Sequence, residues 1–201
     1  MPLTPNTELD LLFPDSLISG DVKRALHQDL HIRPLASTDY NRGHLSVLSV
    51  LTEISDPGEA AWKAQFDALR AFPETYYVVV ILDRATDKIF GVGTLVVERK
   101  FTRGLGKVGH IEDIAVDKAQ QGKKIGLRII NALTYISETL GCYKTILNCS
   151  ESNLIIYPRL IDLRRKLAFY EKCGFEKKEC EMVYQVRERA RTTIIDSHNN
   201  N

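Results

Sequence analysis

Residues 109–126 constrain the fold of this chain most, because an apolar run with two adjacent acids leads directly into a basic loop bracketed by glycines. The run GHIEDIAV (Gly109–Val116) is rich in β-branched residues and is typical of a strand. Alternation along a strand predicts two faces, with Ile111, Asp113 and Ala115 on one and His110, Glu112, Ile114 and Val116 on the other. The loop then offers backbone N–H groups and a helix N-terminus, which together favour a phosphate-bearing ligand.

A helix is predicted after the loop, because apolar residues recur at helical spacing from Ile125 to Leu140, and Gly141 stands where a left-handed cap is favoured. The segment CYKTILNC (Cys142–Cys149) then reads as a strand. Strand, glycine loop, helix and strand is also the order of a dinucleotide-binding crossover, but the GxGxxG fingerprint is absent. The loop alone therefore indicates phosphate binding without identifying the ligand.

The rest of the chain predicts further strands and helices around this unit. Ser37 or Thr38 is expected to cap a helix that buries Leu45, Leu48 and Leu51, and a second helix follows Pro57. Segments 76–83 and 88–101 predict an antiparallel hairpin, and a helix ending at Gly174 and a strand near 180–186 complete the order. We therefore expect an α/β fold, an α+β mixed sheet flanked by helices.

One domain is expected over residues 21–187, between a disordered segment 1–20 and a polar tail 188–201. The chain has 201 residues, 44% of them apolar, which is enough for a substantial core. A formal net charge of +1 gives no reason to expect nucleic-acid binding. No apolar run approaches the ~18 residues of a membrane span.

The N-terminus lacks the features of a secretory signal, so a cytoplasmic protein with reduced cysteines is expected. The four cysteines have no CxxC spacing, which argues against a metal site.

Five sequence blocks, in this order, resemble the glucosamine 6-phosphate N-acetyltransferases, in their fungal form, within the GNAT acyltransferase superfamily. The blocks are LVVERKF (95–101), GHIEDIAV (109–116), QGKKIGLRII (121–130), GCYKTIL (141–147) and FYEKCGF (169–175). With RPL at 33–35 and LT at 51–52, the similarity covers residues 30–186. Within the loop motif of the superfamily, Lys124 replaces the first glycine.

The resemblance implies a GNAT fold and an activity. Acetyl would pass from acetyl-CoA to the amine of glucosamine 6-phosphate, giving N-acetylglucosamine 6-phosphate and CoA for UDP-N-acetylglucosamine biosynthesis. The implied mechanism is direct attack in a ternary complex, by a homodimer without a metal. An amine with electron-withdrawing neighbours has a pKa nearer ~7.7–8.0 than the ~10.4 of lysine, so a strong base is unnecessary.

The resemblance also assigns site residues. Cofactor contacts fall on Ile114, Ala115, Val116, Gln121, Gly122, Lys123, Lys124, Ile125, Gly126, Leu127, Asn153 and Tyr170. Substrate contacts fall on Thr52, Lys100, Phe101, Thr102, Arg103, Glu112, Asp113, Tyr143 and Lys144. The catalytic residues are Tyr170, which would protonate the CoA sulfur, the acid pair Glu112 and Asp113, and Asn148, where the family has an acid.

Each of these assignments has a plainer alternative. Two adjacent acids in an apolar strand cost desolvation energy unless a cation such as an amino sugar meets them, but they could instead be a solvated pair. Tyr170 could simply pack on the core, and Lys100 and Arg103 could form a solvated hairpin end. The chain could also be a GNAT acting on a protein lysine or a polyamine, or a form without activity that either binds CoA or is misfolded.

One segment departs from the family. Removing the 13 residues 155–167 would restore a spacing of four between an asparagine and Tyr170, so we interpret them as an insertion. The insertion carries four basic residues and one acidic residue. Pro158 could begin a helix that extends the following one, or the segment could loop out or be an artefact of the gene model.

Overall fold

A five-stranded sheet forms the centre of the computed structural model, which describes residues 2–148 and 168–177. Its strand order is β1-β2-β3-β4-β5, with antiparallel pairing up to β4 and parallel pairing between β4 and β5. The strands are β1 (Leu30–Pro34), β2 (Tyr76–Asp83), β3 (Ile89–Arg99), β4 (Lys107–Val116) and β5 (Cys142–Leu147). The predicted mixed sheet is therefore confirmed.

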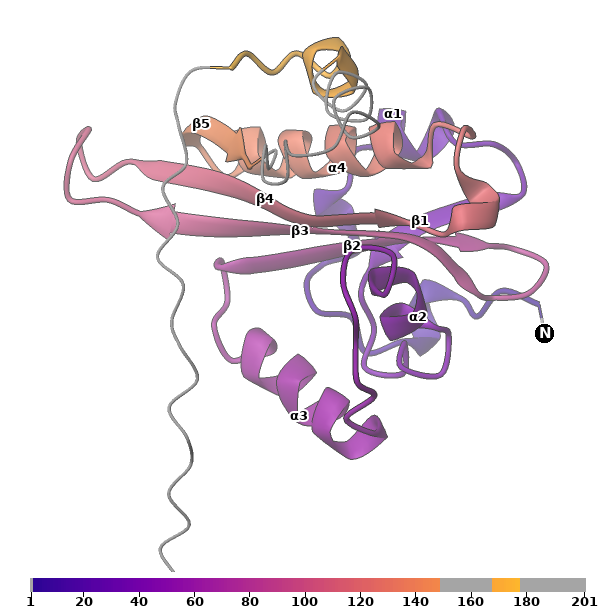
Figure 1. Cartoon of the computed structure of the whole chain (residues 1–201). Coiled ribbons are helices and arrows are strands. Elements are labelled where there is room, and N and C mark those ends of the chain that lie inside the picture. The colour runs from indigo at the N-terminus through magenta and orange to yellow at the C-terminus, as the bar shows by residue number, and fades with distance from the viewer. Residues whose placement is uncertain (1, 149–167, 178–201) are drawn as a thin grey trace, which may run out of the picture.

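Helices cover both faces of the sheet (Figure 1). One face carries α1 (Gly20–Arg24) and α4 (Ile125–Thr139), and the other carries α2 (His44–Leu48) and α3 (Glu59–Arg70). Three short 3-10 turns are η1 (Asn6–Glu8), η2 (Asp15–Leu17) and η3 (Lys118–Gln120). Residues 168–172 are helical, whereas the expected strand near 180–186, the insertion 155–167 and the tail 188–201 lie outside the described residues.

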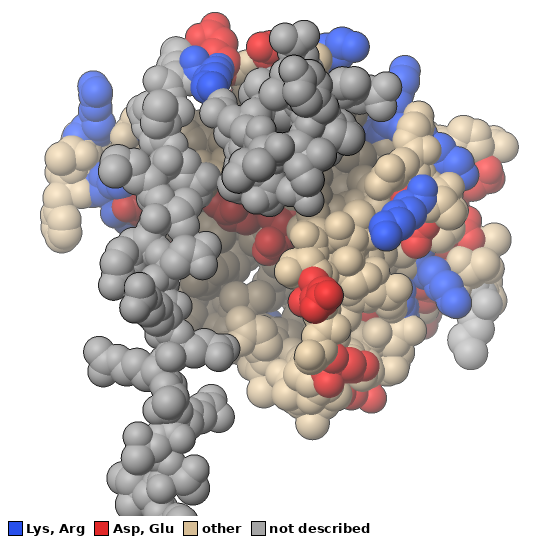
Figure 2. Space-filling view, in the orientation of Figure 1, with Lys and Arg blue, Asp and Glu red and all other residues tan. Residues whose placement is uncertain are grey.

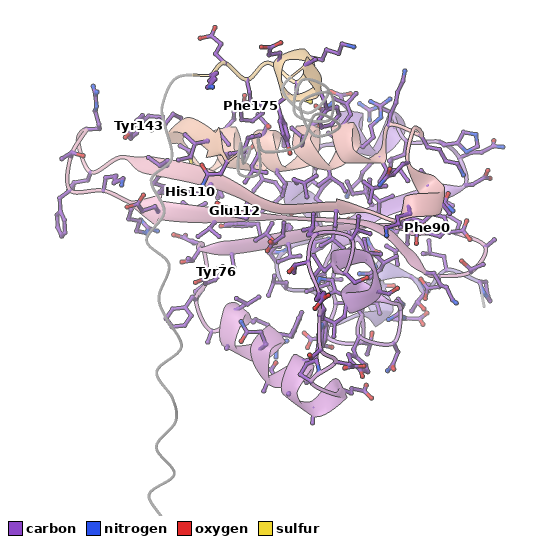
Figure 3. The ribbon with its side chains drawn as sticks, in the orientation of Figure 1. Tyr76, Phe90, His110, Glu112, Tyr143 and Phe175 are labelled. Atoms are coloured by element: carbon purple, nitrogen blue, oxygen red, sulfur yellow. The ribbon has the colours of Figure 1, made fainter. Side chains whose placement is uncertain are left out.

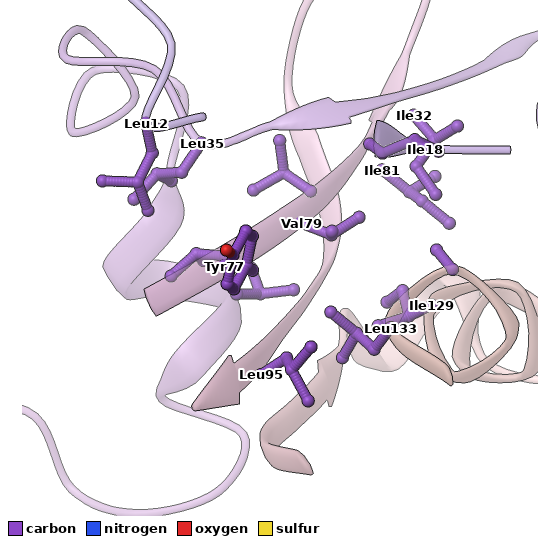
Figure 4. Packing of buried hydrophobic residues seen from close by; sticks show 14 of the residues in the cluster. Leu12, Ile18, Ile32, Leu35, Tyr77, Val79, Ile81, Leu95, Ile129 and Leu133 are labelled. Carbon is purple, nitrogen blue, oxygen red and sulfur yellow. The ribbon is translucent and has the colours of Figure 1, made fainter. Parts of the chain in front are cut away.

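The face of α4 that meets the sheet is mostly apolar, as its helical spacing predicts (Figure 4), and Ser137 is its buried polar exception. Ile129 and Leu133 are completely buried against β2 and β3. Gly93 of β3 makes this approach possible, because a Cβ there would lie 2.4 Å from Cγ2 of Ile129. The helix ends at Thr139, and Gly141 takes the predicted left-handed conformation with φ 76°.

The N-terminal segment is part of the core, which corrects the expectation of a disordered stretch 1–20. Leu12, Phe13 and Ile18 are buried, and the Phe13 ring packs edge-on against Tyr77 with centroids 5.1 Å apart. The Leu12 N–H donates to the Leu35 carbonyl at 2.8 Å. Short apolar clusters between prolines have neither helical nor strand periodicity, so their burial leaves no regular sequence pattern.

The faces predicted for β4 are wrong beyond Glu112, because β4 contains a β-bulge at Asp113. Thr94 of β3 lies opposite Glu112 and Val92 lies opposite Ala115, so β4 holds one extra residue, and Asp113 has φ 55°. The alternation therefore changes phase at this point. Ile114 and Val116 lie on the α4 face together with Ile111, whereas Ala115 lies on the opposite face.

The helix expected after Ser37 or Thr38 begins later and buries other residues. Its N-cap is Gly43, its buried side chains are His44 and Val47, and Leu51 is exposed. The reason is that the carboxylate of Asp39 accepts a hydrogen bond from the N–H of Ala36 and closes a turn first. A short turn-rich segment thus replaces the first part of the predicted helix.

Lowering the pH from 7 to 5 should weaken the packing of α2 against α3. The Trp62 indole N–H donates to Nδ1 of buried His44 at 3.2 Å, and burial, opposed by Asp39, lowers the pKa of His44 from 6.5 to about 4. The pKa of His44 is lower in the folded chain than in the unfolded chain, so neutral His44 contributes its full stability above pH 6.5. This contribution is lost as the pH falls from 6.5 toward the folded pKa of about 4. Linkage gives a loss of about 2 kcal/mol at pH 5.

Urea unfolding at the two pH values measures this loss. His44→Gln keeps an acceptor for Trp62 but does not titrate, so it should lose about 2 kcal/mol less than the parent chain. Equal losses in the two proteins would contradict the assignment to His44.

Candidate functional site

A pocket of about 380 Å³ opens at the N-terminus of α4. Its lining residues come from the end of β4, the following loop, the first turn of α4 and the helix at 168–172, and they are Val116, Gln120, Gln121, Gly122, Lys124, Ile125, Gly126, Leu127, Phe169 and Lys172. Seven of the predicted cofactor residues are among them. The structure thus brings most of the predicted cofactor loop together around one cavity.

The loop has the backbone conformation of an anion cradle. Gly122 has φ 83° and Lys124, the N-cap of α4, has φ 61°, so two left-handed residues lie close together before the helix. The first-turn N–H groups of a helix have no intrahelical acceptor, and the helix dipole adds positive potential at this end. The pocket is therefore suited to a phosphate-bearing ligand.

Replacing Lys124 with glycine should stabilise the fold. A side chain in the left-handed region costs roughly 1 kcal/mol, and glycine adopts this conformation without that strain. We expect the free energy of unfolding to rise by about 0.5–1 kcal/mol in urea titrations, since the entropy of the unfolded chain offsets part of the gain. Lys123→Gly is the matched control, because Lys123 has no positive φ, and it should not be stabilised.

Four of the predicted cofactor residues that the structure describes lie apart from the pocket lining, and Tyr170 is one of them. Lys123 is exposed and donates to Oε1 of Gln120 at 2.6 Å. Ile114 points toward Ile129 beneath Gly93, and Ala115 is buried on the other face because of the bulge. For Ile114 and Ala115, only the backbone groups could therefore meet a ligand between β4 and β5.

The opposite face of β3 and β4 carries a polar stripe that includes Glu112. His110 and Glu112 point to this face, which also carries Tyr76 of β2 (Figure 3). His110 lies 3.0 Å from Glu98, whose other carboxylate oxygen lies 2.5 Å from the Lys100 ammonium. Figure 2 shows acidic side chains at the floor of a hollow on the side of the molecule that it presents.

The β3–β4 hairpin supplies exposed groups beside this stripe. Phe101 is 97% exposed, and the backbone of Arg103 is left-handed with φ 55°. The Arg103 guanidinium lies 6.0 Å from the centre of the Tyr143 ring, so the predicted substrate residues of the hairpin and of β5 meet. Thr102 and Lys144 are also exposed, and Thr52 is exposed in the segment between α2 and α3.

Comparison with known proteins identifies the family. The model of the acetyltransferase (GNAT) family matches residues 44–175. Glucosamine 6-phosphate N-acetyltransferase 1 of Dictyostelium discoideum is 40% identical over 76% of this chain and 88% of its own. The Candida albicans glucosamine 6-phosphate N-acetyltransferase is 36% identical over 79% of this chain and 97% of its own.

Solved structures agree with the sequence matches. The crystal structure of glucosamine-6-phosphate N-acetyltransferase from Arabidopsis thaliana aligns with a TM-score of 0.69 at 31% identity, covering 79% of this chain and 99% of that chain. The chain belongs to the glucosamine 6-phosphate N-acetyltransferases of the GNAT family. GNAT acetyltransferases use acetyl-CoA, and the α4 pocket of this family member lies at a helix N-terminus preceded by two left-handed residues.

The helix at 168–172 of this GNAT chain places the predicted Tyr170 beside a residue of the pocket lining, Phe169. Phe169 lines the α4 pocket, and a Cβ on Gly126 would lie 3.6 Å from its ring. Tyr170 is half-buried, and its ring centre lies 5.3 Å from that of Phe169. Asn148 is exposed just after β5, and Asn153 lies outside the described residues.

Sequence reasoning missed three residues that line the α4 pocket of this GNAT chain, Gln120, Phe169 and Lys172. It also missed the contact between Glu98 and His110 on the polar stripe. Phe169 and Lys172 stand inside the FYEKCGF block, and His110 opens GHIED, so their position in matching blocks was the available signal. The pairing of Glu98 with His110 depends on strand register, which the sequence does not specify.

Within residues 2–148 and 168–177, no group of three potential metal ligands and no helix able to cross a bilayer occurs.

Proposed function

We propose that this protein transfers the acetyl group of acetyl-CoA to the amine of glucosamine 6-phosphate, giving N-acetylglucosamine 6-phosphate and CoA. One observation supports this most: a phosphate cradle at α4 and a stripe of acids and bases on the opposite sheet face flank the same strand, β4. The names of the relatives from Dictyostelium discoideum and Candida albicans support the same substrate. The product suits UDP-N-acetylglucosamine biosynthesis.

The α4 pocket is the proposed cofactor site. Backbone N–H groups of Gly122, Lys124 and Gly126 would hold the pyrophosphate, with Lys123 and Lys172 adding positive charge from the rim. The backbone of Ile114, Ala115 and Val116 would hold the pantetheine arm beside the bulge, beyond the point where the pairing of β4 with β5 ends. Asn153 remains a proposed contact from its sequence position.

The polar stripe is the proposed sugar phosphate site. Lys100 and Arg103 would bind the phosphate, because arginine can hold it through two parallel hydrogen bonds. Glu112 and Asp113 would meet the amine, and Asn148 would hydrogen-bond it without adding charge. Phe101, Thr102, Thr52, Tyr143 and Lys144 would complete the walls.

The reaction follows from these positions. The lone pair of the neutral amine attacks the thioester carbonyl and forms the C–N bond, and the C–S bond breaks. The nitrogen gives up one proton, the sulfur accepts one from Tyr170, and solvent reprotonates the phenolate. Holding both substrates in one complex supplies most of the advantage, since orientation replaces a bimolecular encounter. A covalent enzyme intermediate is not required.

An assay of thiol release tests the proposal. Release of CoA should require both acetyl-CoA and glucosamine 6-phosphate, and glucosamine without phosphate should react far more slowly. Calorimetry with each ligand separately distinguishes the alternatives: a lysine or polyamine acetyltransferase would bind only acetyl-CoA, and an inactive form that cannot hold CoA would bind neither. Binding of acetyl-CoA by a folded protein that never acetylates the sugar would refute the proposal.

Two further features are also proposed: assembly as a homodimer and a cytoplasmic location. The resemblance to the family supports both, and the exposed Phe101 offers apolar surface at the hairpin tip. Analytical ultracentrifugation over a range of concentrations tests the first, and a monomer at all concentrations would exclude it.

A further inference from the structure

The Glu98–His110 pair connects β3 and β4 on the polar stripe. Nε2 of His110 lies 3.0 Å from Oε2 of Glu98, and Oε1 of Glu98 lies 2.5 Å from Nζ of Lys100 (Figure 3). His110 is partly accessible, with 29% of its side chain exposed. The pair is therefore neither a buried structural contact nor a freely solvated surface contact.

This contact fixes the tautomer of the imidazole. Hydrogen bonds from Lys100 and then from His110 hold the pKa of Glu98 below its ordinary value, so the carboxylate is ionised and accepts from Nε2–H. A neutral imidazole with its proton on Nε2 has a free lone pair on Nδ1. Nδ1 has no hydrogen-bond partner among the described residues.

His110 lies between the proposed phosphate end and the proposed amine end of the sugar. It precedes Glu112 by two residues on the same face of β4, before the bulge, so their Cα atoms are about 6.6 Å apart. Lys100 lies on its other side through Glu98. A sugar phosphate that spans Lys100 and Glu112 must therefore pass over the His110 ring.

We infer that His110 is the base of the proposed acetyl transfer, with Glu98 as its positioning residue. The lone pair of the amine forms the C–N bond, the C–S bond breaks, and the N–H proton passes to Nδ1 of His110, directly or through one water. The sulfur takes its proton from Tyr170, and the imidazolium returns its proton to solvent. This inference rests on the proposed function.

Other titratable and charged groups face the same region. They are Glu98 at the end of β3, Lys100 and Arg103 in the following hairpin, Glu112 and Asp113 on β4, Tyr76 on β2 and Lys144 on β5. None of these is removed by a substitution at His110. A change in the pH profile of a His110 variant therefore reports this imidazole.

His110→Gln is the main test, because the amide can still donate to Glu98 but cannot accept a proton at neutral pH. We expect kcat/KM to fall about a hundredfold or more, the range of general base catalysis. In the parent chain, kcat/KM on the acid side should rise with the loss of two protons, one from the sugar ammonium and one from the imidazolium. In His110→Gln it should rise with the loss of one proton, from the sugar ammonium alone. His27→Gln, at an exposed position outside the stripe, is the control.

His110→Ala gives a second readout, since added imidazole should restore part of its activity and should not help His110→Gln, where the space is filled. Acetyl-CoA binding and urea unfolding should match the parent chain. The assignment would be overturned if His110→Gln kept the kcat/KM of the parent chain. It would also be overturned if kcat/KM fell in His110→Gln while its acid limb stayed unchanged and imidazole did not restore the activity of His110→Ala. A parent chain that binds acetyl-CoA but never acetylates the sugar would instead refute the proposed function.

Discussion

Asp39→Ala should lower the free energy of unfolding by about 3–5 kcal/mol, because it leaves a buried arginine without its counter-ion. Arg33 and Asp39 are both 0% exposed, and two guanidinium nitrogens donate to the two carboxylate oxygens at 2.7 Å each. The Ala36 N–H also donates to this carboxylate at 2.7 Å. Arg42 also donates to it at 3.4 Å, so one substitution removes four charge-assisted hydrogen bonds.

Chemical denaturation in urea measures this loss, and Asp67→Ala is the matched control. Asp67 pairs with Lys63 and Arg70 on α3 with about two fifths of each side chain exposed, so solvent screens its ion pairs and they contribute little to stability. Similar losses for Asp39→Ala and Asp67→Ala would mean that the Arg33–Asp39 pair does not hold the β1–α2 turn. A fall in the urea m-value would instead indicate a looser native state.

The fold could be predicted where local pattern and tertiary environment agree. The β-branched run of β4, the loop and the apolar stripe of α4 each specify one structure, and α4 begins at Ile125 as expected. Gly141 marked the end of the helix because a left-handed residue is needed there. Gly122 in the loop before α4 was recognisable for the same reason, since it also has a left-handed backbone.

Other features depend on contacts that the sequence does not display. The extra residue at Asp113 appears only in the pairing of β3 with β4, so strict alternation assigned Ile114 and Ala115 to the wrong faces. Phe13 is buried through its contact with Tyr77, 64 residues later in the chain, and not through any local periodicity. The pairing of Glu98 with His110 is of the same kind, because register brings together residues that no motif links.

Tyr170→Phe should lower kcat by about 10²–10⁴-fold while the affinity for acetyl-CoA stays unchanged, because the proposed role of the phenol is to protonate the leaving sulfur. Its position supports this role. Tyr170 follows Phe169, which lines the α4 pocket, and the two ring centres are 5.3 Å apart. Removing one oxygen leaves the ring to pack as before, so the fold should be unaffected.

Single-turnover measurements with preformed acetyl-CoA complex separate chemistry from product release, and calorimetry gives the cofactor affinity. Tyr135→Phe is the control, because Tyr135 lies on α4 with 41% of its surface exposed and removal of its hydroxyl should change neither quantity. If Tyr170→Phe instead weakens acetyl-CoA binding and leaves the single-turnover rate intact, the phenol positions the cofactor. If both quantities match the parent chain, Tyr170 only packs against its neighbours, and the proton reaches the sulfur from water or from another side chain.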